Sequence, residues 1–517
     1  MIQRVILFAA LSGPLPKLGV IAVASLAAVV LLARDDRLEA VAILAALVLA
    51  PVLLLADIWH SPQLGVVHRH PLVAAVAGVV ALAAVAALAA AIARRPGLFA
   101  ALAVVALPFR IPIQAAGITS NLLVPLYLVI GAGSLAFAVP ALVRGGERAA
   151  APRDPGDRVQ RDAKRWIERL LALSVVLYAI QSFYSPDFEK ALQQMVFFYV
   201  PFTLLFCLLR RINWTGQLLR TCLLLVVGLA VLFSLVGFAE YATKTLFLNP
   251  KLIAENNVHT YFAINSVFFD ADIFGRFLAL VMILLVAVLV YTRRQRLQPT
   301  IVVVLAILWA ALVLTLSRSS LSALLVGLGI IAALRWSVSR TLVLAAVVVA
   351  LGAAAVAISP TTFGLNQGLN GASSGRAGLV SSGLTMFEHR PLWGYGSGAF
   401  VHEYRRQNPT TSQNLAASHT IAITIGAEQG LIGELPYLAL VVACAVGLLR
   451  GARSDMVRAG IAAAFLALVF HTQLYADFLE DPITWTLLGV GVALPLRRPS
   501  RAQQGARPTG EFAAVPA

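Results

Sequence analysis

The segment IFGRFLALVMILLVAVLVYT, residues 273–292, shows the pattern that decides the fold. A helix needs about 20 mostly apolar residues to cross a bilayer, and this segment supplies them with one charged side chain, Arg276. Similar runs lie near 18–33, 39–57, 71–93, 98–113, 121–143, 166–183, 190–209, 217–240, 299–315, 319–335, 341–358, 433–449, 458–474 and 482–495. The bilayer core offers no partner to unpaired backbone groups, and the runs lack β-barrel alternation. We therefore predict an all-α polytopic membrane protein with 12–15 transmembrane helices.

The composition agrees with this class of protein. Of 517 residues, 60% are hydrophobic and 12% charged, whereas about a quarter are charged in a typical soluble domain. The net charge of +16 lies in short loops between apolar runs, where membrane proteins keep basic residues. We therefore favour membrane lipids over nucleic acid as the partner of this charge. Cys207, Cys222 and Cys444 lie within apolar runs and are expected to serve packing.

The positions of Lys and Arg predict the topology. They occur at every second connection, namely 34–37, 94–95, 144–165, 210–211, 293–296, 335–340, 450–458 and 497–498. The positive-inside rule makes these loops cytoplasmic. The long connection 359–432 then faces outward, to the periplasm or the extracellular space. The predicted parts are N-terminal helices in 1–358 with a linker near 145–164, the outer loop 359–432, C-terminal helices in 433–496 and a disordered cytoplasmic tail, 497–517.

Three arginines lie on the predicted outer side, against the general pattern. Arg276 is just inside the outer end of its helix, Arg318 stands at an outer helix junction, and Arg376 follows a glycine in the long loop. Charge at this depth is costly and often marks a site, and the planar guanidinium binds two phosphate oxygens at once. The alternative is that Arg276 and Arg318 snorkel to head groups or pair with a nearby carboxylate such as Asp270 or Asp272.

His419 precedes a long apolar run that reads as a helix. On that helix, position 419 shares a face with 423 and 426, while Glu428 falls on the opposite side, so Glu428 is not expected to contact His419. A histidine can accept a proton from a sugar hydroxyl at neutral pH. A capping or interfacial role is the alternative.

The glycines of Gly394-Tyr395-Gly396-Ser397-Gly398 could suggest a nucleotide-binding loop. No strand or βαβ unit precedes them, so we expect a tight turn at the outer face instead. Asp477, Glu480 and Asp481 form an acidic outer loop without metal-ligand spacing, and we expect no metal and no cofactor.

Four stretches together resemble the O-antigen ligase and O-antigen polymerase family of membrane glycosyltransferases. They are Ser266 to Leu278, Leu316-Ser317-Arg318-Ser319-Ser320, Gly375-Arg376 with His389 to Gly396, and His419 to Gly433. The resemblance implies a GT-C-like fold and a polyprenyl-diphosphate-linked glycan as donor. It also implies a diphosphate held by Arg318 and Arg376, and a catalytic His419. Relatives commonly carry Pro-Asn where this chain has Ala271-Asp272, and Asn where it has Thr420.

The function expected from the sequence is glycosyl transfer at the outer face of the bacterial cytoplasmic (inner) membrane, in surface polysaccharide assembly. Arg276, Arg318 and Arg376 are the expected diphosphate ligands, His419 the catalytic residue, and Arg390 and Glu428 the acceptor-side candidates. The acceptor stays open between a glycan, a lipid and a protein. A transporter or flippase of the same lipid-linked glycan is the main rival, and a non-catalytic scaffold or sensor is a third possibility. A transporter is expected to carry ionisable groups near the midplane and paired repeats, and the sequence shows neither.

Overall fold

The computed structural model describes residues 13–59, 68–109, 111–115, 118–144, 158–246, 262–292, 295–358, 376–409 and 418–495. The N-terminal half contains α2 Pro14–Leu32, α3 Asp36–Ile58, α5 Pro71–Arg94, α6 Gly97–Ala106, β1 Ile111–Ala115, β2 Ile118–Leu122, α7 Val124–Arg144, α8 Arg158–Ser182, α9 Phe188–Gln194, the π-helical turn Met195–Tyr199, α10 Val200–Leu209 and α11 Gly216–Thr243. The C-terminal half contains α13 Ala271–Tyr291, a 3-10 turn at Gln295–Leu297, α14 Gln298–Leu314, α15 Arg318–Arg335, α16 Val338–Ile358, α18 Arg376–His389, α19 Phe400–Gln407, α20 Ile421–Leu449, α21 Met456–Thr472 and α22 Pro482–Ala493.

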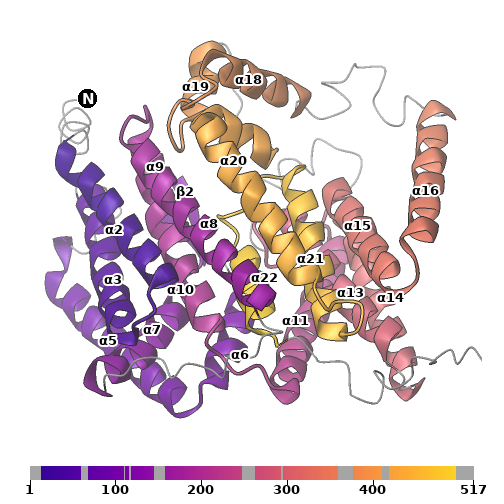
Figure 1. The fold of residues 1–517 in the computed structure, drawn as a ribbon, viewed down its shortest axis with the longest axis horizontal. Helices are drawn as coiled ribbons and strands as arrows, with labels where there is room; N and C mark the ends of the chain where they lie inside the picture. Colours follow the sequence, from indigo (N-terminus) through magenta and orange to yellow (C-terminus); the bar gives the residue numbers. More distant parts are fainter. Residues whose placement is uncertain are drawn as a thin grey trace, which may run out of the picture.

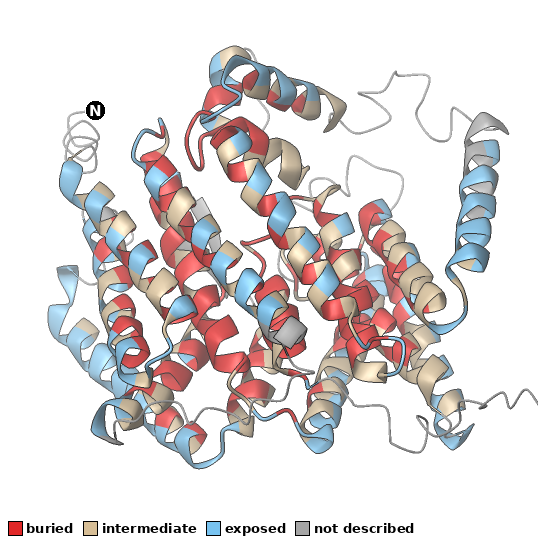
Figure 2. Cartoon of the chain, viewed as in Figure 1, coloured by how far each residue is buried: buried red, intermediate tan, exposed pale blue. Residues whose placement is uncertain are grey.

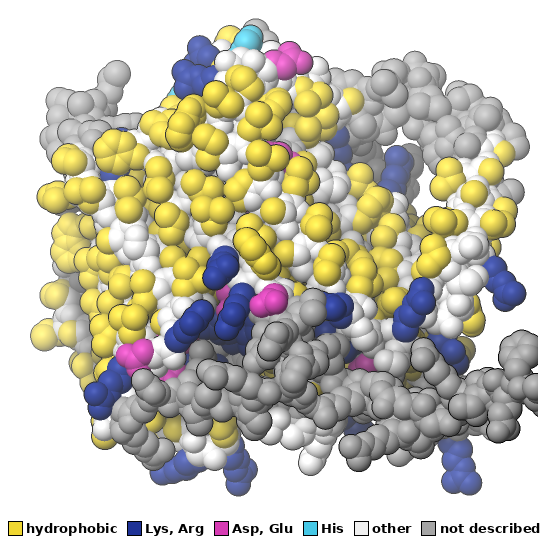
Figure 3. Space-filling view, viewed as in Figure 1, with side chains coloured by type: hydrophobic (Ala, Val, Ile, Leu, Met, Phe, Trp, Pro, Cys, Tyr) yellow, Lys and Arg dark blue, Asp and Glu magenta, His cyan; other side chains and the backbone are white. Residues whose placement is uncertain are grey.

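These elements confirm an all-α polytopic membrane protein. Ten of the described helices are long and apolar enough to cross a membrane, and four shorter apolar helices accompany them. The expected range of 12–15 spans included such shorter segments. A band of hydrophobic side chains runs across the molecule, and Lys and Arg gather along its lower border (Figure 3).

The helices lie side by side in one bundle (Figure 1). In the most apolar window of α13, 72% of the residues are buried, against 6% in that of α5. Helix α13 packs against α15 and α21, while α8 packs against α2 and α20. Figure 2 shows the same gradient, with buried residues in the middle of the bundle and exposed ones on α5 and α16. The N-terminus of α13 therefore presents its side chains to other helices rather than to lipid.

Three basic connections expected on the same side of the membrane meet at one end of the bundle. Arg210 Nη1 lies 2.8 Å from Glu168 Oε1, and Arg211 Nη2 lies 2.9 Å from Asp36 Oδ1. Arg210 Nη2 also lies 3.6 Å from Glu39 Oε1, and both of these side chains are buried. The start of α3, the N-terminal half of α8 and the end of α10 are thus joined by ion pairs.

The structure differs from the sequence expectations at two helix ends. The apolar run 98–113 was expected to be a span, but α6 ends at Ala106 and a β1–β2 hairpin follows. Pro108 and Pro112 lack the backbone N–H that a helix requires, which explains this early end. Helix α8 begins at Arg158, inside the expected linker 145–164, of which 145–157 lie outside the described residues. The expected tail, 497–517, also lies outside them.

Helix α20 unites two expected helices, the one that follows His419 and the span 433–449, because it runs from Ile421 to Leu449. It has two halves that meet at Gly430, whose φ of 63° and ψ of −163° are not helical. A Cβ at Gly430 would lie 2.5 Å from the carbonyl carbon of Leu392, so only glycine allows this close approach. The half from Ile421 to Gln429 packs beside α18, and it places His419 at its start.

Candidate functional site

The N-termini of four helices, α13, α15, α18 and α20, meet at one end of the bundle. Ser317, at the start of α15, donates a hydrogen bond to Asp272 of α13. Arg376, at the start of α18, has Nη2 3.4 Å from Asp272 Oδ2. The start of α20 joins the group through the end of α21, where Thr420 Oγ1 donates to the carbonyl of Gln473 at 3.0 Å and Arg376 donates to the next carbonyl, of Leu474. Helix N-termini carry partial positive charge and unpaired N–H groups, so this arrangement suits an anionic ligand.

Two of the three predicted arginines lie at this junction. Arg376 is about one third exposed at its side chain and also donates from Nη1 to the carbonyl of Leu474 at 3.1 Å. Arg318 is the first residue of α15, is exposed, and has no ion pair within the described part of the chain. Both guanidinium groups can therefore reach a ligand without first being released from a buried partner.

Arg276 has different surroundings, although it lies only about one turn after Asp272 on α13. Its Nη2 lies 2.9 Å from Asp481 Oδ2, and the side chains are 2% and 1% exposed. Its Nε and Nη1 are buried without a hydrogen-bond partner in the structure. Its guanidinium also lies 5.9 Å from the ring centre of Tyr475. The structure thus places Arg276 beneath the site, in an ion pair that joins α13 to the start of α22.

His419 lies at the open junction, as the sequence predicts. Its ring packs edge-on against Tyr475, with the ring centres 5.9 Å apart. Burial lowers the pKa of His419, the positive charge of Arg376 lowers it further, and Asp272 and Asp477 oppose that change. The lowered pKa favours the neutral imidazole, which is the form that can accept a proton.

Tyr475 connects His419 to the acidic residues below it. Its hydroxyl donates to Asp270 Oδ2 at 3.0 Å, and burial next to that carboxylate raises the tyrosine pKa well above its usual range. His471 lies on the other side of the ring, with its centre 5.8 Å away, and its Nε2 is 3.4 Å from Ser320 Oγ. Tyr475 and His471 were not singled out from the sequence, because nothing in their local pattern distinguishes them from ordinary helix-end residues.

Backbone conformations that cost energy also gather here. Among described non-glycine residues, positive φ occurs here at Leu316, His419 and Asp477, and elsewhere at Lys244 and Ser266. Leu316 precedes the Ser317–Ser320 turn, His419 packs against Tyr475, and Asp477 follows two residues after Tyr475. Such residues are disfavoured by about 1–3 kcal/mol each and concentrate at functional sites. They support a site at this junction independently of the charges.

Glu428 lies away from His419, as its position on the helix predicts, and holds the glycine-rich loop. Its Oε2 accepts from the N–H of Gly398 at 2.8 Å, and its Oε1 accepts from the N–H of Phe400 at 3.0 Å. The N–H of Gly396 donates to the backbone carbonyl of Glu428 at 2.7 Å. Gly394, Gly396 and Gly398 all have positive φ, which confirms the predicted tight turn.

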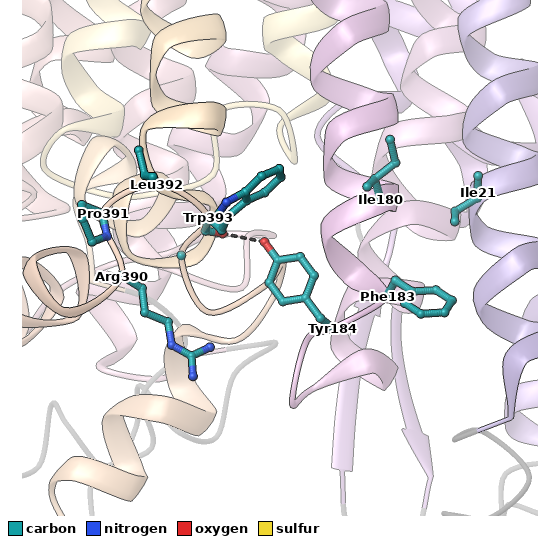
Figure 4. A pocket seen from close by; sticks show the side chains of 9 residues that line it. Ile21, Ile180, Phe183, Tyr184, Arg390, Pro391, Leu392 and Trp393 are labelled. Carbon is teal, nitrogen blue, oxygen red and sulfur yellow. Dashed lines mark hydrogen bonds between the residues drawn. The ribbon is translucent and has the colours of Figure 1, made fainter.

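Arg390 stands at the edge of a groove of about 730 Å³. The walls are apolar and come from three places: Ile21 of α2, Ile180 to Tyr184 at the end of α8, and Arg390 to Gly394 of the loop. Figure 4 shows Tyr184 and Trp393 facing each other, with the tyrosine hydroxyl bonded to the Trp393 carbonyl at 2.5 Å. The Arg390 guanidinium lies 4.4 Å from the ring centre of Tyr395. An amphipathic molecule with a negative group suits these surroundings.

Residues 301–438 match the family model described as O-antigen ligase. This segment is therefore similar to an O-antigen ligase domain. It contains Arg318, Arg376, Arg390, His419 and Glu428, whereas Arg276 precedes it. The matched segment thus holds every predicted site residue except the one that the structure buries in an ion pair. The chain has no match among curated proteins.

The match to the O-antigen ligase model confirms the family resemblance seen in the sequence. The apolar helices indicate a multi-pass membrane protein, and the match supports O-antigen ligase-type function in polysaccharide assembly. Within the described residues, no group of three or more His, Cys, Asp or Glu side chains is arranged to hold a metal ion.

Proposed function

We propose that this protein transfers a glycan from a polyprenyl-diphosphate-linked donor to an acceptor hydroxyl at the outer face of the bacterial cytoplasmic membrane. The observation that carries the proposal is the meeting of Arg318, Arg376 and His419 at the junction of α15, α18 and α20. Two accessible guanidinium groups lie beside helix N-termini, and a neutral histidine lies next to them. Binding of a diphosphate and removal of a hydroxyl proton need groups of these kinds.

The proposed reaction inverts the anomeric carbon in one displacement. The acceptor oxygen forms a bond to the anomeric carbon while the bond from that carbon to the diphosphate oxygen breaks. The electron pair of the broken bond leaves with the diphosphate, where Arg318 and Arg376 stabilise the developing charge. His419 accepts the proton of the acceptor hydroxyl. No metal or cofactor is part of this proposal.

We assign Arg276 an indirect part in diphosphate binding. Its pairing with Asp481 fixes the first turns of α13 against the start of α22, beneath Tyr475. It adds positive charge under the site without touching the donor. The sequence-based expectation of a direct contact is thus replaced, in our proposal, by a supporting role.

The acceptor side is proposed to lie toward the Arg390 groove. Arg390 is at its edge, and Glu428 fixes the loop that forms one wall. Backbone bonds join this loop to the half-helix from Ile421 to Gln429, which is about 14 Å long at 1.5 Å per residue. A glycan of a few sugar units on an acceptor at the groove could therefore extend to His419.

The test separates binding from chemistry. In proteoliposomes containing a defined lipid-linked donor, His419→Ala is expected to lower transfer by roughly 10²–10⁴-fold and to leave donor binding nearly unchanged. Product formation at the wild-type rate in this variant would contradict the catalytic role of His419. If the wild type moves the donor across the bilayer and forms no product with any acceptor class, the protein is a transporter.

A further inference from the structure

Asp272 is the side chain through which the arginine-bearing elements contact each other. It is the second residue of α13, and its backbone N–H donates to its own helix cap, Asp270, at 2.6 Å. Its Oδ1 accepts from the hydroxyl of Ser317 and from that of Ser319, the latter at 3.1 Å. The Ser319 and Ser317 side chains are the immediate neighbours of Arg318 in the chain.

The second carboxylate oxygen of Asp272 faces a different element. Oδ2 lies 3.4 Å from Nη2 of Arg376, and the two side chains are 21% and 37% exposed. The backbone carbonyl of Asp272 accepts a third serine hydroxyl, from Ser320, at 3.2 Å. One residue therefore contacts the turn around Arg318 on one side and the Arg376 guanidinium on the other.

We propose that Asp272 is a positioning residue that fixes the spacing of Arg318 and Arg376 for a diphosphate. This inference rests on the proposed function. Two guanidinium groups repel each other, and each belongs to a different helix, so a carboxylate that bonds to both elements stabilises their approach in this chain. A diphosphate has two phosphate groups at a fixed separation, and arginines held at a matching distance lose less conformational freedom on binding.

The carboxylate chemistry is what distinguishes this role from simple packing. An asparagine has nearly the same shape and keeps one oxygen for the serine hydroxyls. Its amide nitrogen, however, would face the Arg376 guanidinium as a second donor, with no acceptor between them. The Asp272→Asn substitution thus removes the link to Arg376 while sparing the link to the Arg318 turn.

The same substitution has an electrostatic consequence at His419. The charged groups that face this histidine are Arg376 of α18, Asp272 of α13 and Asp477 of the loop before α22, and Tyr475 adds an aromatic ring. Asp272 and Asp477 oppose the lowering of the His419 pKa by burial and by Arg376. Removing the Asp272 charge must therefore move the His419 titration to lower pH, an effect that a purely structural role does not produce.

The experiment compares Asp272→Asn with a matched control, Asp455→Asn. Asp455 lies, like Asp272, at the start of a helix, where it accepts from the N–H of Val457 at 2.9 Å and of Arg458 at 3.1 Å, but at the opposite end of the bundle. For Asp272→Asn we expect the donor KM to rise about tenfold, the effect of losing one charge-assisted contact, with a smaller fall in kcat. The control should keep the wild-type KM.

The His419 titration gives a readout that does not depend on turnover. It can be followed by NMR of ¹³C-labelled histidine, with the His419 signal assigned from the His419→Ala variant. The midpoint should move to lower pH in Asp272→Asn and stay at the wild-type value in Asp455→Asn. A third variant, Ser319→Ala, removes a hydroxyl contact without changing charge, so it should raise the KM slightly and leave the midpoint in place.

Two results would overturn the inference about Asp272. One is an unchanged donor KM and His419 midpoint in Asp272→Asn with an intact thermal unfolding transition. The other is tighter donor binding in that variant, which would mean that Asp272 competes with the diphosphate instead of arranging its ligands. A wild-type protein that forms no product at all would instead refute the proposed function, while donor binding and the His419 titration would still test Asp272.

Discussion

The ion pair between Arg276 and Asp481 allows a quantitative test of how the site is supported. Both side chains are almost completely buried, and Nη2 lies 2.9 Å from Oδ2. Removing one partner of a buried pair leaves an uncompensated charge and costs about 3–5 kcal/mol. Asp481→Asn is suited to the test because Asp481 also caps α22 by accepting from the N–H of Ile483 at 2.9 Å, and asparagine is an equally good cap. The substitution therefore removes only the charge.

A double-mutant cycle measures the coupling between the two residues. We expect Arg276→Gln and Asp481→Asn each to lower the free energy of unfolding by about 3 kcal/mol or more. The double variant should lose less than the sum, because no unpaired charge remains, and the difference should be about 1–3 kcal/mol. Unfolding can be followed by tryptophan fluorescence in mixed micelles, since Trp485 lies on α22 and is fully buried.

A second pair provides the control. Arg406 and Glu403 pair within α19, where the arginine side chain is 63% exposed, so Arg406→Gln should leave the unfolding transition unchanged. If the Arg276 and Asp481 effects simply add, to within about 0.5 kcal/mol, the two residues are not coupled. Arg276 would then be free to contact the donor directly, as the sequence first indicated.

Further predictions concern the loop, the acidic residues, the arginines and the topology. Gly394→Ala should detach the loop from α20 and lower both stability and transfer, because its Cβ would lie 2.3 Å from the carbonyl atoms of Glu428. The control Gly329→Ala places its Cβ in open space and should be tolerated. Equal thermal unfolding of the two variants would contradict this prediction. Burial, with Asp477 nearby, raises the pKa of Glu480. The folded state therefore keeps a proton that the unfolded state loses, and thermal stability should fall as pH rises above about 4.5. Glu480→Gln should make stability less dependent on pH in this range, and an unchanged pH dependence would contradict the assignment. Arg318→Lys keeps the charge but loses the planar fork, and transfer should drop by at least about tenfold, with wild-type activity indicating a snorkelling residue. A cysteine placed near Gln367 should react with an impermeant reagent from outside and one near Gly156 only from inside; labelling of both from one side would refute the topology.

The sequence by itself determined the class of fold, because the relevant information is local. A run such as 273–292 must become a helix in a bilayer wherever its neighbours lie, since its backbone groups have no other partners. The start of α13 is also readable, because Asp270 caps the helix from within the same few residues. The glycines at 394, 396 and 398 predicted a turn for the same reason. His419 was recognisable by its place before an apolar run.

Only the tertiary structure decided which of these residues meet. Asp481 neutralises Arg276 from the far end of the chain, and no periodicity connects the two positions. Glu428 was an acceptor-side candidate, and the kink at Gly430 and the returning loop direct its carboxylate to the backbone N–H groups of Gly398 and Phe400. Such partners are set by the packing of helices that are distant in the sequence. A single sequence gives the composition of each helix face but does not say which other helix packs against that face. For that reason the helices could be read from the chain, while the division of its charged residues between site and support required their positions in space.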